Sequence, residues 1–288
     1  MTNWPIGLST GCFYQRNILD CLEAIRASGF SMIEVCSSPT HLDYHDLGAV
    51  RAVAARIEQL GMEAFSFHAP FADWIDISAL DRDHRGRALQ EILRAVEAAA
   101  ALRVHHFVLH PGPEHANIPP QEERLRRMEN TVSVINEVAR RCGELGISCV
   151  LENKLPHLLF GNISDILWIL ASLDGGNGGG NVGACLDTGH AFLSDDLPNL
   201  LRKLAGHLRM LHVHDNRKQF DDHLPPGDGK IDWPWLMKEL VTTGFHGTLV
   251  LEMAGTPDPN TTLENARRGR SYLRRIAREV ALGPGGRK

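Results

Sequence analysis

The sequence lacks several features that would place it in other classes of protein. Its 288 residues contain no run of about 18 apolar residues, which a helix needs to span a bilayer, so we expect no membrane partner. Residues Met1–Pro5 carry no basic stretch followed by an apolar one, so we expect no secretory signal and a cytoplasmic location. Basic charge is not in excess, because 30 Lys and Arg stand against 35 Asp and Glu. This balance argues against a protein held on nucleic acid by bulk charge.

The composition is that of a folded globular chain. Hydrophobic residues make up 43% and charged residues 23%, close to the averages of roughly 45–50% and ~25% for globular domains. The six cysteines include no C-x-x-C pair, and most lie in apolar stretches. We therefore expect a large core and buried, reduced thiols.

Eight short apolar runs alternate with longer amphipathic segments along the chain. The runs are rich in Val, Ile, Leu and Phe, which is typical of parallel strands covered on both faces. These predicted strands are Ile6–Thr10, Met32–Cys36, Ala64–Phe67, Val104–Leu109, Ile147–Leu151, Val182–Leu186, Leu208–Val213 and Thr248–Leu251. The predicted helices include Ile18–Ser28, Leu47–Leu60, Arg87–Ala101, Glu122–Leu145, Trp233–Val241 and Leu263–Ala281.

Eightfold alternation of strand and helix predicts the α/β class and a closed (β/α)8 TIM barrel. An open doubly wound sheet that binds a dinucleotide typically has a G-x-G-x-x-G turn after its first strand. Residues 9–13 read S-T-G-C-F instead. No segment has a second core of its own. We predict one domain over residues 1–288, with a flexible loop at 175–180 and a flexible tail at 283–288.

Polar side chains follow six consecutive predicted strands, at the end where a TIM barrel carries its chemistry. In chain order they are His68, His110, Glu152, Asp187, His212 and Glu252. Because the carboxyl ends of the strands meet at the barrel mouth, we expect these side chains to converge. Converging carboxylates in a partly dry pocket repel one another unless a cation neutralises them. The pattern therefore predicts a divalent metal, and mixed His and carboxylate ligands favour Zn²⁺, Mn²⁺ or Fe²⁺ over Ca²⁺.

Two further segments extend this cluster. His190 follows the carboxylate of the sixth strand by three residues and is expected in the loop that leaves this strand. Asp221 and His223 stand in a later loop rich in Pro and Gly. This spacing lets Asp221 and His223 bind a metal from one side. We expect His214 to lie on the opposite side of its strand from His212, and therefore to pack behind the site instead of binding a metal.

Taken in order, these residues resemble the superfamily of xylose-isomerase-like TIM barrels. That superfamily includes sugar and sugar-phosphate isomerases and epimerases, inosose dehydratases and AP endonucleases of the endonuclease IV type. The resemblance runs from the first strand to the eighth. For the isomerase and epimerase branch it implies one divalent metal held by Glu152, Asp187, His212 and Glu252, with the two glutamates moving a proton.

For the endonuclease branch the same resemblance implies three zinc ions and nine ligands, all of which are present. The first ion would take His68, His110 and Glu152, the second Glu152, Asp187, His212 and Glu252, and the third His190, Asp221 and His223. The resemblance therefore implies a cofactor of at least one divalent ion and at most three.

Departures from the endonuclease pattern favour the sugar branch. Glu34, in the second predicted strand, is of a sugar-isomerase-like form and is expected to face the pocket. The loop at 154–157 reads K-L-P-H and is not the Gly-rich form of the DNA enzymes. The loop at 37–40 is small and neutral, and it offers no basic, aromatic segment to wedge into a duplex.

Our first hypothesis is a divalent-metal-dependent isomerase or epimerase of a small sugar, sugar phosphate or polyol. A polarised carbonyl makes the neighbouring C–H acidic, and one glutamate of the Glu152 and Glu252 pair removes that proton. The opposite carboxylate or a solvent-linked acid returns it, and His190 orients a substrate oxygen. Further substrate contacts are expected from Glu34 and from an apolar wall of Phe13, Phe71 and Trp74.

Two other hypotheses stay open. One is a multinuclear phosphodiesterase, including an abasic-site endonuclease, and only in that case would nucleic acid be a partner. The other is a binding or scaffold protein stabilised by metal, which would show no turnover. The sequence identifies neither the exact substrate nor the metal, and it leaves open whether the chain forms a homo-oligomer.

Overall fold

A computed structural model of the chain describes residues 4–174 and 181–282, and all structural statements below concern that part. The loop predicted at 175–180 and the tail predicted at 283–288 lie outside the described residues. Within the described residues, no helix is both long enough and apolar enough to cross a membrane.

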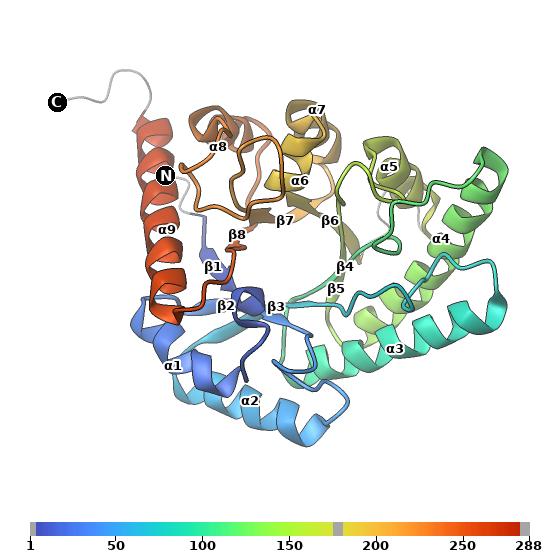
Figure 1. The fold of residues 1–288 in the computed structure, drawn as a ribbon, viewed down its shortest axis with the longest axis horizontal. Helices are drawn as coiled ribbons and strands as arrows, with labels where there is room; N and C mark the ends of the chain where they lie inside the picture. The colour runs from blue at the N-terminus through green and yellow to red at the C-terminus, as the bar shows by residue number, and fades with distance from the viewer. Residues whose placement is uncertain (1–3, 175–180, 283–288) are drawn as a thin grey trace.

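Eight parallel strands form a closed barrel in which each strand pairs with its neighbours in the sequence and β8 pairs with β1 (Figure 1). The strands are β1 Ile6–Ser9, β2 Met32–Cys36, β3 Glu63–His68, β4 His106–Leu109, β5 Ser148–Glu152, β6 Val182–Asp187, β7 Leu208–Val213 and β8 Thr248–Leu251. This architecture confirms the predicted TIM barrel, and each of the eight predicted strands corresponds to an observed one.

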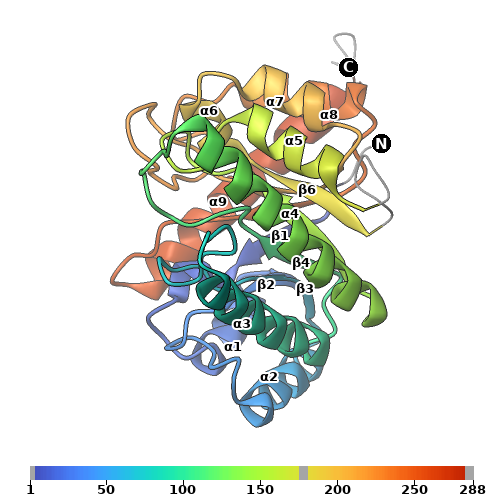
Figure 2. The ribbon, with the colours of Figure 1, turned by 90° about the vertical axis from the view of Figure 1, so that its right-hand side faces the viewer.

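The helices surround the barrel and cover the outer faces of its strands (Figures 1 and 2). They are α1 Leu19–Ala27, α2 Leu47–Gln59, α3 Arg82–Ala101, α4 Gln121–Glu144, α5 Ile163–Ser172, α6 Thr188–Leu193, α7 Leu197–Leu204, α8 Trp233–Thr242 and α9 Pro259–Leu282. A short 3-10 helix, η1 (Thr10–Phe13), follows β1. Their apolar faces and the outward side chains of the strands form one continuous core.

The barrel interior has a separate apolar layer that sets the depth of the residues above it. Side chains from six successive strands form this layer: Phe65, Val108, Val150, Cys185, Met210 and Val250. Because side chains alternate between the two faces of a strand, the residue two positions further along points into the same interior. On five of these strands that residue is polar: His110, Glu152, Asp187, His212 or Glu252.

All six cysteines are free thiols, and five of them are buried. Burial raises the pKa of Cys185 to about 12, so this thiol in the barrel interior stays protonated. Cys36 is partly exposed and lies at the end of β2. The structure therefore agrees with the expectation of reduced, mostly buried cysteines.

Candidate functional site

Four side chains meet directly above the apolar layer of the barrel. Ligand atoms of Glu152, Asp187, His212 and Glu252 all lie within 4.8 Å of one another. His212 Nδ1 is 3.2 Å from Glu152 Oε2 and 3.5 Å from Glu252 Oε1. This nitrogen is buried and has no hydrogen-bond partner among the described residues. A buried imidazole nitrogen that faces two carboxylates without hydrogen-bonding geometry fits the donor set of a divalent cation.

Glu34 lies behind this group and does not face the cavity, which corrects the expectation of a substrate contact. Its side chain is fully buried, Ser66 Oγ donates to its Oε2 at 2.8 Å, and His212 Nε2 donates to the same oxygen at 3.0 Å. A hydrogen on Nε2 leaves Nδ1 free to accept a metal. Glu34 therefore orients His212 from below and is not part of the cavity wall.

A second group shares Glu152 with the first. The Nε2 atoms of His68 and His110 each lie 3.2 Å from Glu152 Oε2. Each ring is oriented by its other nitrogen, since His68 Nδ1 contacts the carbonyl of Ala69 at 2.9 Å and His110 Nδ1 contacts Glu114 Oε1 at 2.7 Å. Glu152 therefore stands between two sets of nitrogen and oxygen ligands, where a bridging carboxylate would stand.

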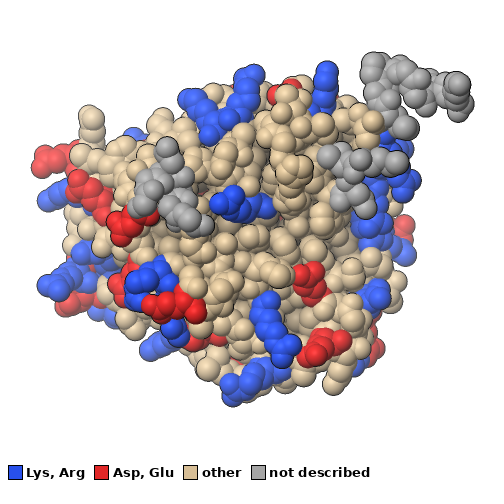
Figure 3. Space-filling view, turned by 180° about the vertical axis from the view of Figure 1, so that it is seen from behind, with Lys and Arg blue, Asp and Glu red and all other residues tan. Residues whose placement is uncertain are grey.

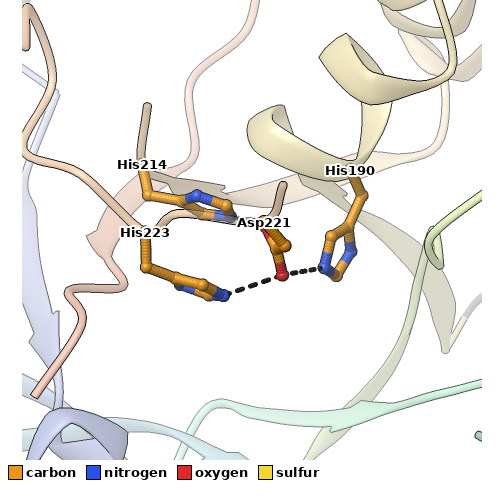
Figure 4. A group of neighbouring side chains, drawn as sticks. All are labelled: His190, His214, Asp221 and His223. Carbon is orange, nitrogen blue, oxygen red and sulfur yellow. Dashed lines mark hydrogen bonds and ion pairs between the residues drawn. The ribbon is translucent and has the colours of Figure 1, made fainter. Parts of the chain in front are cut away.

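A third group lies beside the first at the ends of β6 and β7 (Figure 4). Asp221 Oδ2 lies between His190 Nε2 at 3.3 Å and His223 Nε2 at 3.0 Å, the two contacts dashed in the figure. Asp221 Oδ1 is buried and has no hydrogen-bond partner among the described residues, and His214 Nε2 lies 3.8 Å from it. Ligand atoms of these three residues and of His214 lie within 4.8 Å of one another.

The position of His214 corrects the side on which this residue was expected to lie, although its ring is fully buried and does not line the cavity. Its Nε2 lies 2.9 Å from Asp187 Oδ2, and its ring stacks on that of His223 with 3.9 Å between centroids. Side chains two residues apart on a strand share a face, so His214 points to the same side as His212 and not to the opposite one. It contacts both Asp187 and the third group directly.

Helix α6 fixes the link between the first and third groups. Asp187 ends β6 and caps α6, because its Oδ1 accepts the backbone N–H of His190 at 2.6 Å. The His190 ring is held from its other side, where Nδ1 contacts the carbonyl of Asn153 at 2.9 Å. His190 therefore lies in the first turn of a helix and not in the loop expected from the sequence.

A cavity of about 720 Å³ opens above the three groups. The candidate ligands on its wall are His68, His110, Glu152, His190, Asp221, His223 and Glu252. Trp74 and Phe71 also line it, as expected from the sequence. Phe13 does not, and this expectation is wrong: its side chain is 5% exposed and packs in the core at the end of η1, while Tyr14 reaches the cavity instead.

The two glutamates of the first group have opposite electrostatic environments. For Glu152, burial raises the pKa, but the neighbouring imidazoles of His212 and His110 outweigh burial and hold it well below its usual range. For Glu252, burial raises the pKa, and repulsion by Glu152 and Glu34 raises it further against the attraction of His212. The two carboxyl groups of this pair therefore have pKa values shifted in opposite directions.

The histidines respond to the same carboxylates. Burial lowers the pKa of His68, but the hydrogen bond and charge of Glu152 outweigh burial and raise it to about 9. Burial likewise opposes charge at His223, where the bond to Asp221 and the charge of Glu252 raise the pKa to about 9. In the bare chain, protons on imidazoles balance the carboxylates, and a metal would take their place.

Glu114 and Lys154 support the second group, and neither was expected from the sequence. Lys154 is buried, and its Nζ contacts Glu114 Oε1 at 3.1 Å and the carbonyl of Gly112 at 2.9 Å. Glu114 in turn orients His110. The signal that could have found them is position, because Lys154 lies two residues beyond a strand-end ligand and Glu114 lies four beyond another.

The protein is therefore a TIM barrel with a polar site at the carboxyl ends of its strands. The chain belongs to the xylose isomerase-like TIM barrel family, whose model matches residues 22–276.

Individual proteins similar to this chain include sugar epimerases and, over a shorter stretch, an endonuclease. Fructoselysine 3-epimerase of Shigella flexneri is 23% identical over 230 residues, which cover 78% of this chain and 81% of that protein. A probable endonuclease 4 of Nitratidesulfovibrio vulgaris is 33% identical, but only over 145 residues, 50% of this chain and 48% of the endonuclease. A solved D-tagatose 3-epimerase-like protein shares the fold with a TM-score of 0.82 at 22% identity, covering 96% of this chain and 98% of that one.

Proposed function

We propose that the chain is a divalent-metal-dependent epimerase or isomerase of a small sugar or polyol that carries a carbonyl group. The observation that carries the proposal is the convergence of Glu152, Asp187, His212 and Glu252 within 4.8 Å under a cavity of about 720 Å³. Relatives with sugar-epimerase names that span most of the chain support the reaction class. The cavity is of a size that small-molecule sites commonly have, roughly 300–1,000 Å³.

The donor set fits a metal, and the four residues of the first group would hold it. A bound divalent ion would supply a Lewis acid that polarises the substrate carbonyl. His212 is oriented for this by Glu34 at 3.0 Å. His190, in the third group, lines the cavity and would orient a substrate oxygen.

The opposite environments of Glu152 and Glu252 assign their roles in proton transfer. Glu152 has a lowered pKa and is ionised, so its carboxylate accepts the proton from the carbon beside the carbonyl. The electron pair of the broken C–H bond moves toward the carbonyl oxygen. Glu252, whose pKa is raised, or an acid linked to solvent would then return a proton to carbon. Return to the opposite face of the same carbon gives epimerisation. Return to the neighbouring carbon, with the hydroxyl proton of the first carbon passing to the former carbonyl oxygen, gives isomerisation.

Proton exchange tests this proposal. The metal-loaded protein is incubated in heavy water with a panel of ketoses, ketose derivatives and inososes, and deuterium at the carbon beside the carbonyl is measured. We expect incorporation with the wild type and loss of roughly 1,000-fold in Glu152→Gln, since proton transfer alone contributes about 10²–10⁴-fold. Glu122→Gln is the matched control, because it makes the same change at an exposed residue of α4, and it should keep full exchange. No incorporation across the panel with metal bound would contradict the proposal.

A second candidate function is a multinuclear phosphodiesterase of the endonuclease IV type. The observation that favours it is the presence of three adjacent ligand groups where an epimerase of this kind needs one. Against it, Lys154 is the only Lys or Arg among the described residues that line the cavity, so the site offers few cationic partners for a phosphate backbone. Figure 3 shows the opposite end of the barrel, where both signs of charge are interspersed. Nicking of an abasic duplex by the metal-loaded wild type, lost in Glu152→Gln, would establish this function in place of the first.

A further inference from the structure

The part of the cavity wall that adjoins the candidate ligands at His68 and His110 is apolar. It is built by the segments that follow β1, β2 and β3, and its main members are Tyr14, Cys36, Pro39, Phe71, Trp74 and Ile75. Three of these, Tyr14, Phe71 and Trp74, are named here the aromatic wall. Their exposed fractions are 52%, 55% and 55%, which is high for large apolar side chains that share one cavity.

The aromatic wall begins directly against the candidate ligands. The ring of Phe71 lies 5.3 Å from that of His68 and 5.2 Å from that of His110, measured between centroids. A molecule whose oxygens sit at the ligand groups therefore has its remaining atoms in contact with this wall.

Several polar groups near the wall are already hydrogen-bonded within the protein. The Tyr44 hydroxyl donates to Glu91 Oε1 at 2.5 Å, and Ser38 Oγ donates to the carbonyl of Tyr14 at 3.1 Å. Ser9 Oγ accepts the backbone N–H of Gly11. These contacts occupy part of the hydrogen-bonding capacity of the polar groups beside the wall, whereas the aromatic faces themselves offer apolar contact area.

The cavity also offers little to a phosphate outside the candidate ligands. Among the described residues that line it, Lys154 is the only Lys or Arg. Its Nζ is occupied by Glu114 and by backbone carbonyls, including that of Gly112. A phosphate dianion at the aromatic wall would therefore lose its hydration without gaining a cationic partner.

We propose that the substrate is an unphosphorylated ketose or ketoglycoside that carries an aryl or alkyl substituent, and that this substituent packs on the aromatic wall. The inference rests on the proposed function, because it assumes that the sugar oxygens lie at the candidate ligands. The cavity volume of about 720 Å³ lies within the range of roughly 300–1,000 Å³ that drug-sized ligands occupy and leaves room beyond a free sugar.

Calorimetric binding to the metal-loaded protein tests the inference with three matched probes. They are D-fructose, D-fructose 6-phosphate and 6-O-benzyl-D-fructose, which differ only at one carbon. We expect the benzyl ether to bind at least about tenfold more tightly than the free sugar, because burial of an aromatic ring is favourable. We expect the phosphate to bind more weakly than the free sugar.

Variants locate the effect. Trp74→Ala and Phe71→Ala should each remove most of the benzyl preference, whereas Leu125→Ala, which shortens an exposed apolar residue on α4 outside the cavity, should keep it. Binding of the phosphate as tight as that of the benzyl ether, a preference unchanged in both wall variants, or no binding of any probe would overturn the inference.

Deuterium exchange separates this inference from the proposed reaction. A benzyl preference with no exchange in any substrate would refute the proposed reaction and leave the ligand class standing. Deuterium exchange together with tighter binding of the phosphate would support the proposed reaction and refute the ligand class.

Discussion

The alternation of side chains along a strand decides which residues meet in this protein. Val150, Met210 and Val250 fill the barrel interior, and Glu152, His212 and Glu252 follow them by two positions. This rule needs only the order of residues along each strand, so the candidate ligands are predictable from the sequence. The expectation for His214 was wrong because it went against this rule, which places His214 on the face of His212.

The depth at which a side chain lies in the barrel is harder to predict than the face of the strand to which it points. The pairing of β2 with β3 shifts register between Ile33 and Glu34, and Glu34 lies under His212 and out of the cavity. The turn of η1 likewise directs Phe13 into the core and leaves Tyr14 exposed. Such local irregularities depend on backbone geometry that hydrophobic periodicity does not record.

Glu34→Gln provides a test at this scale. The amide keeps the shape of the side chain but removes the charge that raises the basicity of His212, so we expect affinity for Zn²⁺ or Mn²⁺ to fall about 10–100-fold. Competition with a chelator of known affinity measures the loss. Glu23→Gln, which removes an exposed carboxylate on α1, is the matched control. Unchanged metal affinity in Glu34→Gln would remove this residue from the site.

Among the elements, α6 joins the first group of candidate ligands to the third. Its six residues hold His190 in place, and its cap Asp187 is itself a candidate ligand. Gly189 lies so close to His214 that an added Cβ would overlap the imidazole ring. The sequence pattern predicts a loop at α6, because a helix of six residues spans fewer than two turns and shows little periodicity.

Gly189→Ala therefore displaces His214 without removing any candidate ligand. We expect loss of metal from the third group and a fall of a few °C or more in thermal midpoint, since the ring has to move within a packed interior. Gly86→Ala is the control, because this helical glycine on α3 has open space at its Cβ and the substitution should be neutral or stabilising by about 0.5–1 kcal/mol. Equal behaviour of the two variants would contradict the packing described for α6.

At the scale of the whole molecule, barrel closure brings together ligands that lie as far apart in the sequence as His68 and Glu252. Alternation of strands and helices made this fold predictable, because few other topologies bury eight consecutive apolar strands on both faces. The apolar half of the cavity was less predictable. It depends on how the segments after β1, β2 and β3 lie over the barrel, and loop conformation leaves a weak trace in sequence.

The account of the site depends on one condition, that bound cations neutralise the repulsion between the carboxylates that converge with the imidazoles at the barrel mouth. Counting metal ions per chain tests it most directly, by elemental analysis of protein purified without chelator and then supplied with Zn²⁺ and Mn²⁺. We predict at least one and at most three ions per chain, with the count reduced in Glu152→Gln and unchanged in Glu122→Gln. A folded, soluble wild-type protein that retains no ion under these conditions would contradict it.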